Sequence, residues 1–106
     1  MQEAIKPLED QEALERARLN QETARIPWRE LQRFFAQGRV IAVDPELDLV
    51  ELALQCALDE AGAIVGELEQ GRMAPVSDEQ ARAWLEANAE VWAVVVKPWV
   101  LVQDRP

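Results

Sequence analysis

The stretch VWAVVVKPWVLVQ, residues 91–103, contains the strongest strand signal in this chain of 106 residues. Both sides of its pleat are apolar, with Trp92, Val94 and Val96 on one side and Val91, Ala93 and Val95 on the other. A strand that is apolar on both sides is covered on both faces, so this segment lies inside the fold. Because proline cannot donate to a strand ladder, Pro98 predicts a bulge, a bend or an edge position.

Two further segments are expected to join this strand in a sheet. Residues 39–43 form a nearly unbroken β-branched run, which favours a strand, and Asp44-Pro45 then turns the chain. Residues 72–76 are expected to be extended, because Pro75 disfavours the helical conformation at Ala74. The sequence therefore predicts a small mixed sheet of about three strands.

The segment from residue 8 to about Gln37 carries a helical seam. Its members are spaced alternately by three and four residues: Leu14, Ala17, Gln21, Ala24, Trp28, Leu31 and Phe35. Pro27 predicts either a kink or two helices with a junction near residues 23–27, and the apolar face is continuous in both cases. Gly38 is a stop signal at the end.

Two more helical regions follow the first strand. Polar residues recur every three or four positions from Asp48, which predicts a helix with a break near Asp59 and a second helix after it. Residues 77–80 fit a capping box that opens another helix. We predict an α+β, helix-rich single domain at 8–103, in the order helix(es)-strand-helix(es)-short strand-helix-strand. Residues 1–7 and 104–106 are expected to be tails.

Composition and charge narrow the expected partners. The one cysteine, Cys56, cannot form an intramolecular disulfide, the first thirty residues lack a secretion signal, and the longest apolar run is too short to cross a bilayer. We therefore expect a cytoplasmic protein without a membrane partner. The net charge is −9, and residues 40–70 carry eight carboxylates and no base. Such a surface repels nucleic acid and favours a basic protein or a second copy.

Three pieces of the chain resemble a known family. They are LNQETARIPWRELQRFFAQGRVIAVDPELDLVELA, APVSDEQARAWLE and VWAVVVKPWVLVQ, which together cover most of residues 19–103. The chain resembles a family of small bacterial proteins classed as a domain of unknown function, from whose pattern it departs at Leu68. The resemblance implies a compact intracellular domain and supplies no mechanism.

The chemistry of the residues excludes several kinds of site. There is no histidine, which excludes Ser/His/Asp and Cys/His catalysis, and one cysteine cannot make a zinc site of the Cys and His type. We predict no catalytic, cofactor-binding or metal-binding residues. Asp44, Asp48 and Glu51 form a candidate polar site. It is either a solvated turn, in which Asp48 caps the next helix and Glu51 reaches back, or a weak cation site.

A row of arginines and one tryptophan are candidates for an interaction surface. Arg18, Arg25, Arg29 and Arg33 follow one helical stripe. The stripe is either a solvated face with i, i+4 ion pairs, or it docks against the acidic region 44–69 within the fold or across a dimer. Trp99 follows the bend expected at Pro98, where it is either a core residue or an interface anchor.

Two functions are consistent with these features. The first is a non-catalytic protein-interaction or regulatory module without cofactors, which binds a protein partner or self-associates as a homodimer. The alternative is a small-molecule-binding domain or enzyme with a carboxylate/arginine pocket near the acidic turn.

Overall fold

A five-stranded mixed sheet forms the centre of the protein, which is represented by a computed structural model that describes residues 8–59, 66 and 68–105. Its strands are β1 (Ala24–Pro27), β2 (Val40–Val43), β3 (Met73–Pro75), β4 (Glu90–Val96) and β5 (Trp99–Gln103). The strand order is β1-β4-β5-β2-β3, and only the β2 and β5 pair is parallel among the strand pairs of the described residues. The α+β class is confirmed, but the prediction of about three strands is wrong.

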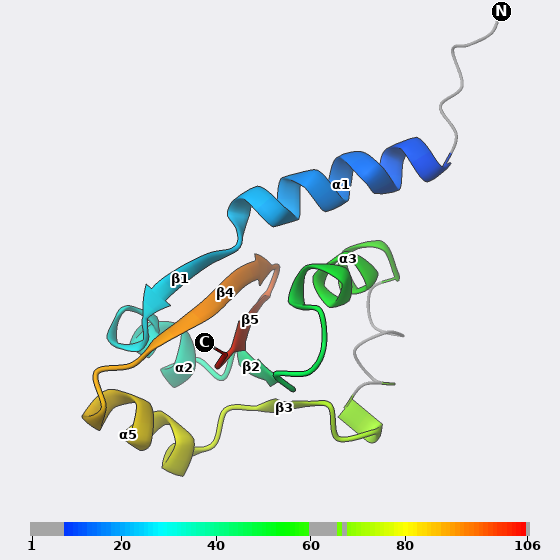
Figure 1. Ribbon diagram of the computed structural model, residues 1–106. Helices are drawn as coiled ribbons and strands as arrows, with labels where there is room; N and C mark the ends of the chain where they lie inside the picture. The colour runs from blue at the N-terminus through cyan, green and yellow to red at the C-terminus, as the bar shows by residue number, and fades with distance from the viewer. Residues whose placement is uncertain (1–7, 60–65, 67, 106) are drawn as a thin grey trace, which may run out of the picture.

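Helices flank this sheet, as Figure 1 shows. They are α1 (Leu8–Glu22), the 3-10 helix η1 (Trp28–Leu31), α2 (Gln32–Ala36), α3 (Leu49–Asp59) and α5 (Asp78–Glu86). Ser77 Oγ accepts a hydrogen bond from the Gln80 N–H at 3.0 Å, which confirms the predicted cap of α5. The helix predicted after Asp59 and the tail at 1–7 lie outside the described residues. No helix in the described ranges is long and apolar enough to cross a membrane.

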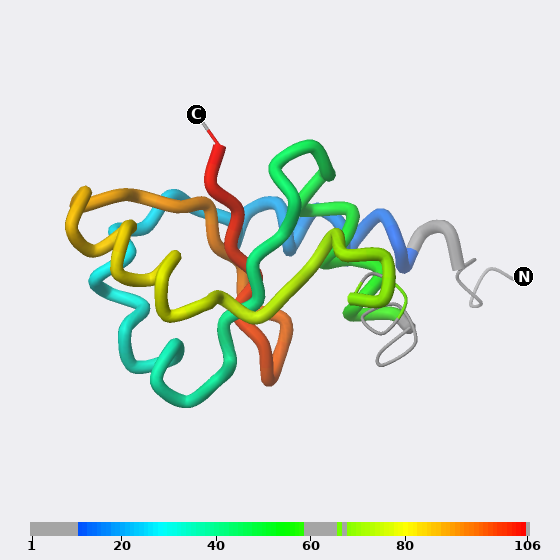
Figure 2. Tube along the Cα trace, turned by 90° about the horizontal axis from the view of Figure 1, so that it is seen from below, coloured from blue at the N-terminus to red at the C-terminus, as the bar shows by residue number. Residues whose placement is uncertain are grey.

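The segment 91–103 forms two strands instead of the single strand that we expected. Strand β4 pairs with β5 in antiparallel fashion from Trp92 opposite Gln103 to Val96 opposite Trp99. Lys97 and Pro98 make the turn between them, and their peptide bond is cis. The antiparallel pairing shows that the chain reverses at these two residues, and in Figure 2 the turn stands out as a narrow loop.

Residues 8–37 form two helical regions with a junction at residues 23–27, which is the second of the two predicted alternatives, but the prediction of a continuous apolar face is wrong. Helix α1 ends at Glu22, where Thr23 Oγ1 donates to the Leu19 carbonyl at 2.7 Å, and the chain then forms β1 along β4. The reason is that Pro27 disfavours a helical Ile26, while β4 offers hydrogen-bonding partners to an extended chain. Among the seam residues Leu14, Ala17, Gln21 and Ala24 are exposed, whereas Leu19, outside the seam, is fully buried.

Apolar side chains cover both faces of the sheet. The first core lies between the sheet, α3 and the end of α1, and includes Leu19, Leu52, Ala53, Val94 and Leu101. The second core lies between the sheet, η1 and α5, and includes Trp28, Leu31, Trp84, Val91 and Val100. Alternate residues of β4 and β5 therefore belong to opposite cores, as the two apolar pleat sides predicted.

Two tryptophans join the helices of the second core. The Trp28 and Trp84 rings lie 5.0 Å apart between centroids, and Phe35 contacts Trp28 at 5.7 Å. Trp84 Nε1 donates to Asp104 Oδ2 at 3.2 Å, so a residue beyond β5 contacts α5. Trp28 and Trp84 are both buried in this core.

Candidate functional site

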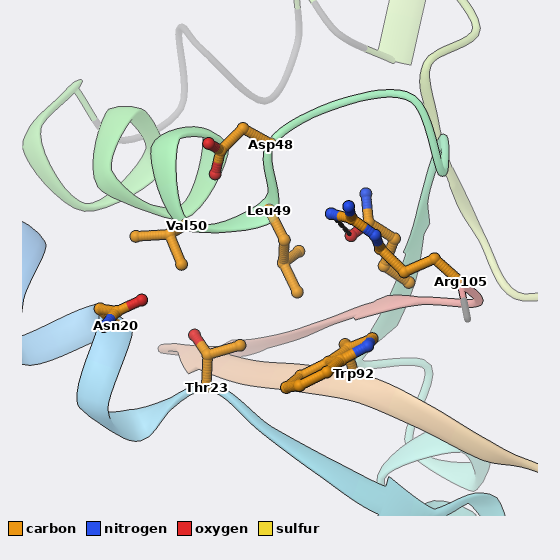
Figure 3. Close-up of a pocket in the computed structure, with 8 residues that line it drawn as sticks. Asn20, Thr23, Asp48, Leu49, Val50, Trp92 and Arg105 are labelled. Carbon is orange, nitrogen blue, oxygen red and sulfur yellow. Dashed lines mark hydrogen bonds between the residues drawn. The ribbon is translucent and has the colours of Figure 1, made fainter.

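A cavity of about 240 Å³ lies between helices α1 and α3 and the β4–β5 part of the sheet. We call it the interlayer cavity. Its apolar lining is Leu49, Val50 and Trp92, and its polar lining is Asn20, Thr23, Asp48, Gln103 and Arg105. Figure 3 shows Leu49 and Val50 reaching from α3 towards Thr23 and Trp92, with Asp48 and Arg105 at separate points of the rim. The cavity thus places an acid and a base around an aromatic ring.

The wall that carries Asp48 is the predicted acidic turn, and a buried glutamine holds it. Gln103 is 1% exposed, and its Nε2 donates to the carbonyls of Asp44 at 2.9 Å and Leu47 at 2.7 Å. The Leu47 N–H donates to the same Asp44 carbonyl at 3.0 Å. Since buried amide groups need partners, these bonds fix the turn against the end of β5.

Asp48 begins helix α3. Its Oδ1 accepts the Glu51 N–H at 3.1 Å, which confirms the predicted cap. No arginine or lysine nitrogen lies within 4 Å of this carboxylate among the described residues. One negative charge at the rim of the interlayer cavity is therefore without an ion-pair partner in this part of the chain.

The carboxylates of Glu51 and Asp44, the other two residues of the predicted polar site, have partners of their own, although Asp48 and Glu51 line one cavity with Arg16 and the charge of Asp48 helps to raise the pKa of Arg16. Glu51 forms a two-bonded ion pair with Arg16 of α1, with Nη2 and Oε1 at 3.2 Å, and this partner raises the pKa of Arg16. Asp44 Oδ1 instead accepts the Glu46 N–H at 2.8 Å. The described residues contain no group of three or more acidic or cysteine side chains that could hold a metal ion.

Asp44 lines a second cavity on the opposite side of the turn. This cavity of about 350 Å³ also contains Arg72, Trp84 and Asp104. The predicted polar site is thus divided: Asp48 faces the interlayer cavity, and Asp44 faces the second cavity. Sequence spacing could not reveal the division, because the turn that separates the two residues is held by distant Gln103.

Sequence reasoning missed Arg105 and Trp92 as site residues. Arg105 Nη1 donates to Gln103 Oε1 at 3.4 Å, and no carboxylate lies within 4 Å of its guanidinium in the described ranges. Trp92 is half-buried and lies on the pleat side that faces α3. The alternation of residues along β4 predicts that Trp92 faces α3. The sequence predicts Arg105 only as part of a tail, and no sequence signal links Arg105 to Asp48.

The arginine stripe does not exist as one surface, because β1 interrupts the helix. On α1, Arg18 binds Glu15 and Glu22, and this contact lowers the pKa of Glu15 and raises that of Arg18. The other three arginines of the predicted stripe have different partners. Arg25 Nε lies 3.8 Å from Glu90 Oε1, and Arg29 Nη1 donates to Asn88 Oδ1 at 2.8 Å. The guanidinium of Arg33 lies over the Phe34 ring. Arg16, which the stripe omits, makes the contact between α1 and the acidic region.

Trp99, the candidate interface anchor, is half-buried and packs against the first core. It follows Pro98 at the base of the turn, opposite Val96. This packing favours the first of the two predicted alternatives, in which Trp99 is a core residue. Its use as an interface anchor stays a prediction.

A groove separates α1 from the β4–β5 turn. This hairpin groove of about 530 Å³ is lined by Glu15, Arg18, Leu19, Glu22, Ala57, Val95, Val96 and Lys97. Val95 is 50% exposed, and Leu58, next to Ala57, is 48% exposed. Leu14, one helical turn before Arg18, is 61% exposed. Val95 is therefore an exposed aliphatic residue of the groove, and Leu14 is exposed one helical turn away from it.

Comparisons with known proteins agree with the fold. Residues 15–104 match a family described as a protein of unknown function (DUF2288). The chain is similar to PA1075 from Pseudomonas aeruginosa, whose solution structure was determined by NMR, with 40% identity and a TM-score of 0.73. The similarity covers 96% of this chain and 94% of that chain. No curated protein matches. Because the family match spans most of the sequence, the chain belongs to the DUF2288 family of proteins of unknown function.

Proposed function

We propose that this protein is a non-catalytic interaction module that self-associates through the hairpin groove. The observation that carries this proposal is the exposure of Val95 in that groove and of Leu14 one helical turn before its lining residue Arg18. Single exposed aliphatic residues are ordinary, but a group of them at a concave surface is typical of a protein-protein contact. Burial of these side chains would release ordered water and favour association.

The edge of β4 supports pairing with a second copy. Strand β1 pairs with β4 only from Glu90 to Ala93, and no other strand of the described residues pairs with Val94–Val96 on that side. A strand edge that pairs with no other strand is a template for a further strand, and here α1 lies beside that edge across the hairpin groove. Two copies related by a twofold axis would place their β4 edges side by side, which is the symmetry of most homodimers.

The charges around the hairpin groove favour the same arrangement. Lys97 forms no ion pair among the described residues, while Glu15 and Glu22 lie across the groove on α1. A twofold axis brings Lys97 of each copy towards the acidic side of the other. Glu15 and Glu22 also pair with Arg18 of their own chain, so Lys97 of a second copy would share these carboxylates with that arginine.

Substitution of Val95 tests this proposal. We expect the wild-type protein to sediment as a dimer at concentrations of about 10–100 μM, and Val95→Lys to sediment as a monomer, because lysine at a strand edge opposes pairing. Leu85→Lys is the matched control, since Leu85 is 49% exposed but lies on α5, outside the groove. Sedimentation velocity gives the mass, and circular dichroism verifies that both variants are folded.

The outcomes are distinct. A wild-type protein that remains monomeric up to about 1 mM would contradict self-association. A dimer that both Val95→Lys and Leu14→Gln leave intact would show that another surface holds the copies together.

A further inference from the structure

We infer that the interlayer cavity binds a small zwitterionic molecule, with the carboxylate of the ligand on Arg105 and its cationic group on Asp48. This site is independent of the self-association proposed above, because the hairpin groove has a different lining. The inference develops the small-molecule alternative by identifying the acid, the base and the class of ligand.

The first argument is that two side chains of opposite charge, Asp48 and Arg105, line one cavity without forming an ion pair. Asp48 and Arg105 both line the interlayer cavity, yet they form no ion pair with each other or with any described residue. A guanidinium has five N–H donors, and the hydrogen bond of Arg105 to Gln103 at 3.4 Å uses one of them. A carboxylate has about four acceptor positions, of which the Glu51 N–H occupies one at Asp48. Both groups have free capacity for a ligand.

The second argument is the apolar wall beside the two charges. The indole of Trp92 and the side chains of Leu49 and Val50 provide an apolar surface for the body of a ligand (Figure 3). A volume of about 240 Å³ is below the usual range of about 300–1,000 Å³ for pockets that bind drug-sized compounds. The cavity therefore suits a molecule as small as a free amino acid. Asn20 and Thr23 add polar atoms to the same wall.

The third argument is preorganisation. Asp48 is held by its bond to the start of α3, and Gln103 links the turn that carries Asp48 to the guanidinium of Arg105. Groups that are fixed before binding lose less conformational entropy when the ligand arrives. Asp48 is thus held by the fold, and Arg105 is linked to the same turn by one long hydrogen bond.

An NMR titration tests the inference with L-leucine as the probe. Leucine carries both charges and an apolar body, while acetate and isobutylammonium carry one charge each. We expect a saturable shift of the Trp92 indole N–H with leucine, and binding that is at least about tenfold weaker for either single-charge compound. The indole N–H signals of Trp28 and Trp84 serve as internal controls, because both rings lie in the second core.

Two charge-neutral variants identify the residues. Asp48→Asn keeps a helix-capping oxygen and removes the charge, and Arg105→Gln removes the cation from an exposed position. We expect each variant to weaken leucine binding at least about tenfold, and Arg82→Gln on the exposed side of α5 to leave it unchanged.

Three results would overturn the inference. The first is the absence of a saturable Trp92 shift with leucine up to about 10 mM. The second is equal affinity for acetate and leucine, which would leave no role for Asp48. The third is unchanged leucine binding in both Asp48→Asn and Arg105→Gln, whose folding is verified by their amide spectra.

Discussion

At the scale of single residues, the side chain of Gln103 connects three parts of the chain through its hydrogen bonds. It is the one buried polar residue in the described part of the chain, and it joins the end of β5 to the turn at 44–47. Both walls of the interlayer cavity depend on this amide, since its oxygen also accepts from Arg105. A side chain that sequence reasoning did not single out thus positions the candidate site.

Gln103→Met tests this role, because methionine has a similar length and no hydrogen-bonding amide. We expect the free energy of unfolding to fall by about 1–3 kcal/mol, since the carbonyls of Asp44 and Leu47 each lose a hydrogen bond and only that of Asp44 keeps another donor, the Leu47 N–H. Gln21→Met on exposed α1 is the matched control and should change stability by less than about 0.5 kcal/mol. Urea unfolding measures both values. Equal effects of the two substitutions would contradict the anchoring role of Gln103.

At the scale of elements, α1 is the helix whose buried residues differ most from the sequence prediction. Figure 1 shows this helix extending past the sheet, with its last turns closest to β4. Leu19 near its end is fully buried in the first core, whereas Leu14 is 61% exposed. The helix is therefore attached to the first core through its final turns.

Leucine truncations along α1 test this attachment. In the monomer, Leu19→Ala should lower the free energy of unfolding by about 2–5 kcal/mol, because it leaves a cavity in the first core. Leu14→Ala makes the same chemical change at an exposed site and should cost less than about 0.5 kcal/mol. Thermal or urea unfolding at a concentration where the protein is monomeric compares the two. A larger loss of stability for Leu14→Ala than for Leu19→Ala would support the predicted helical seam and contradict the observed packing of α1.

At the scale of the whole molecule, the sheet separates two cores that share its central strands. Strand β5 lies between β4 and β2, and its alternate side chains enter the first and the second core. By contrast, β1 and β3 are the edge strands. Stability should therefore be highest in β5 and lowest at the two edges.

Amide hydrogen exchange followed by NMR measures this gradient. We expect the slowest exchange for the amides of Val100, Leu101 and Val102, which open only when both cores open. The amides of β1 and β3 should exchange faster under the same conditions. Equal protection in β1 and β5 would contradict the assigned strand order.

Much of the secondary structure could be predicted from local pattern. The β-branched run at 40–43, the capped helix after Ser77 and the two apolar sides of β4 depend on neighbours in the sequence, and each is confirmed. Asp48 was identified for the same reason, because its capping bond reaches only three residues ahead. Local chemistry also excluded sites that need histidine or paired cysteines.

By itself, the sequence determined the α+β class, the buried β4–β5 segment and the position of the acidic turn. The tertiary structure decided that 91–103 folds back at Pro98, that residues 24–27 leave the helix to pair with β4, and that Asp48 meets Trp92 and Arg105 around one cavity. These outcomes depend on contacts between residues up to 69 positions apart, such as Ala24 opposite Ala93. Local periodicity contains no information about such contacts, because they form only when the whole sheet assembles.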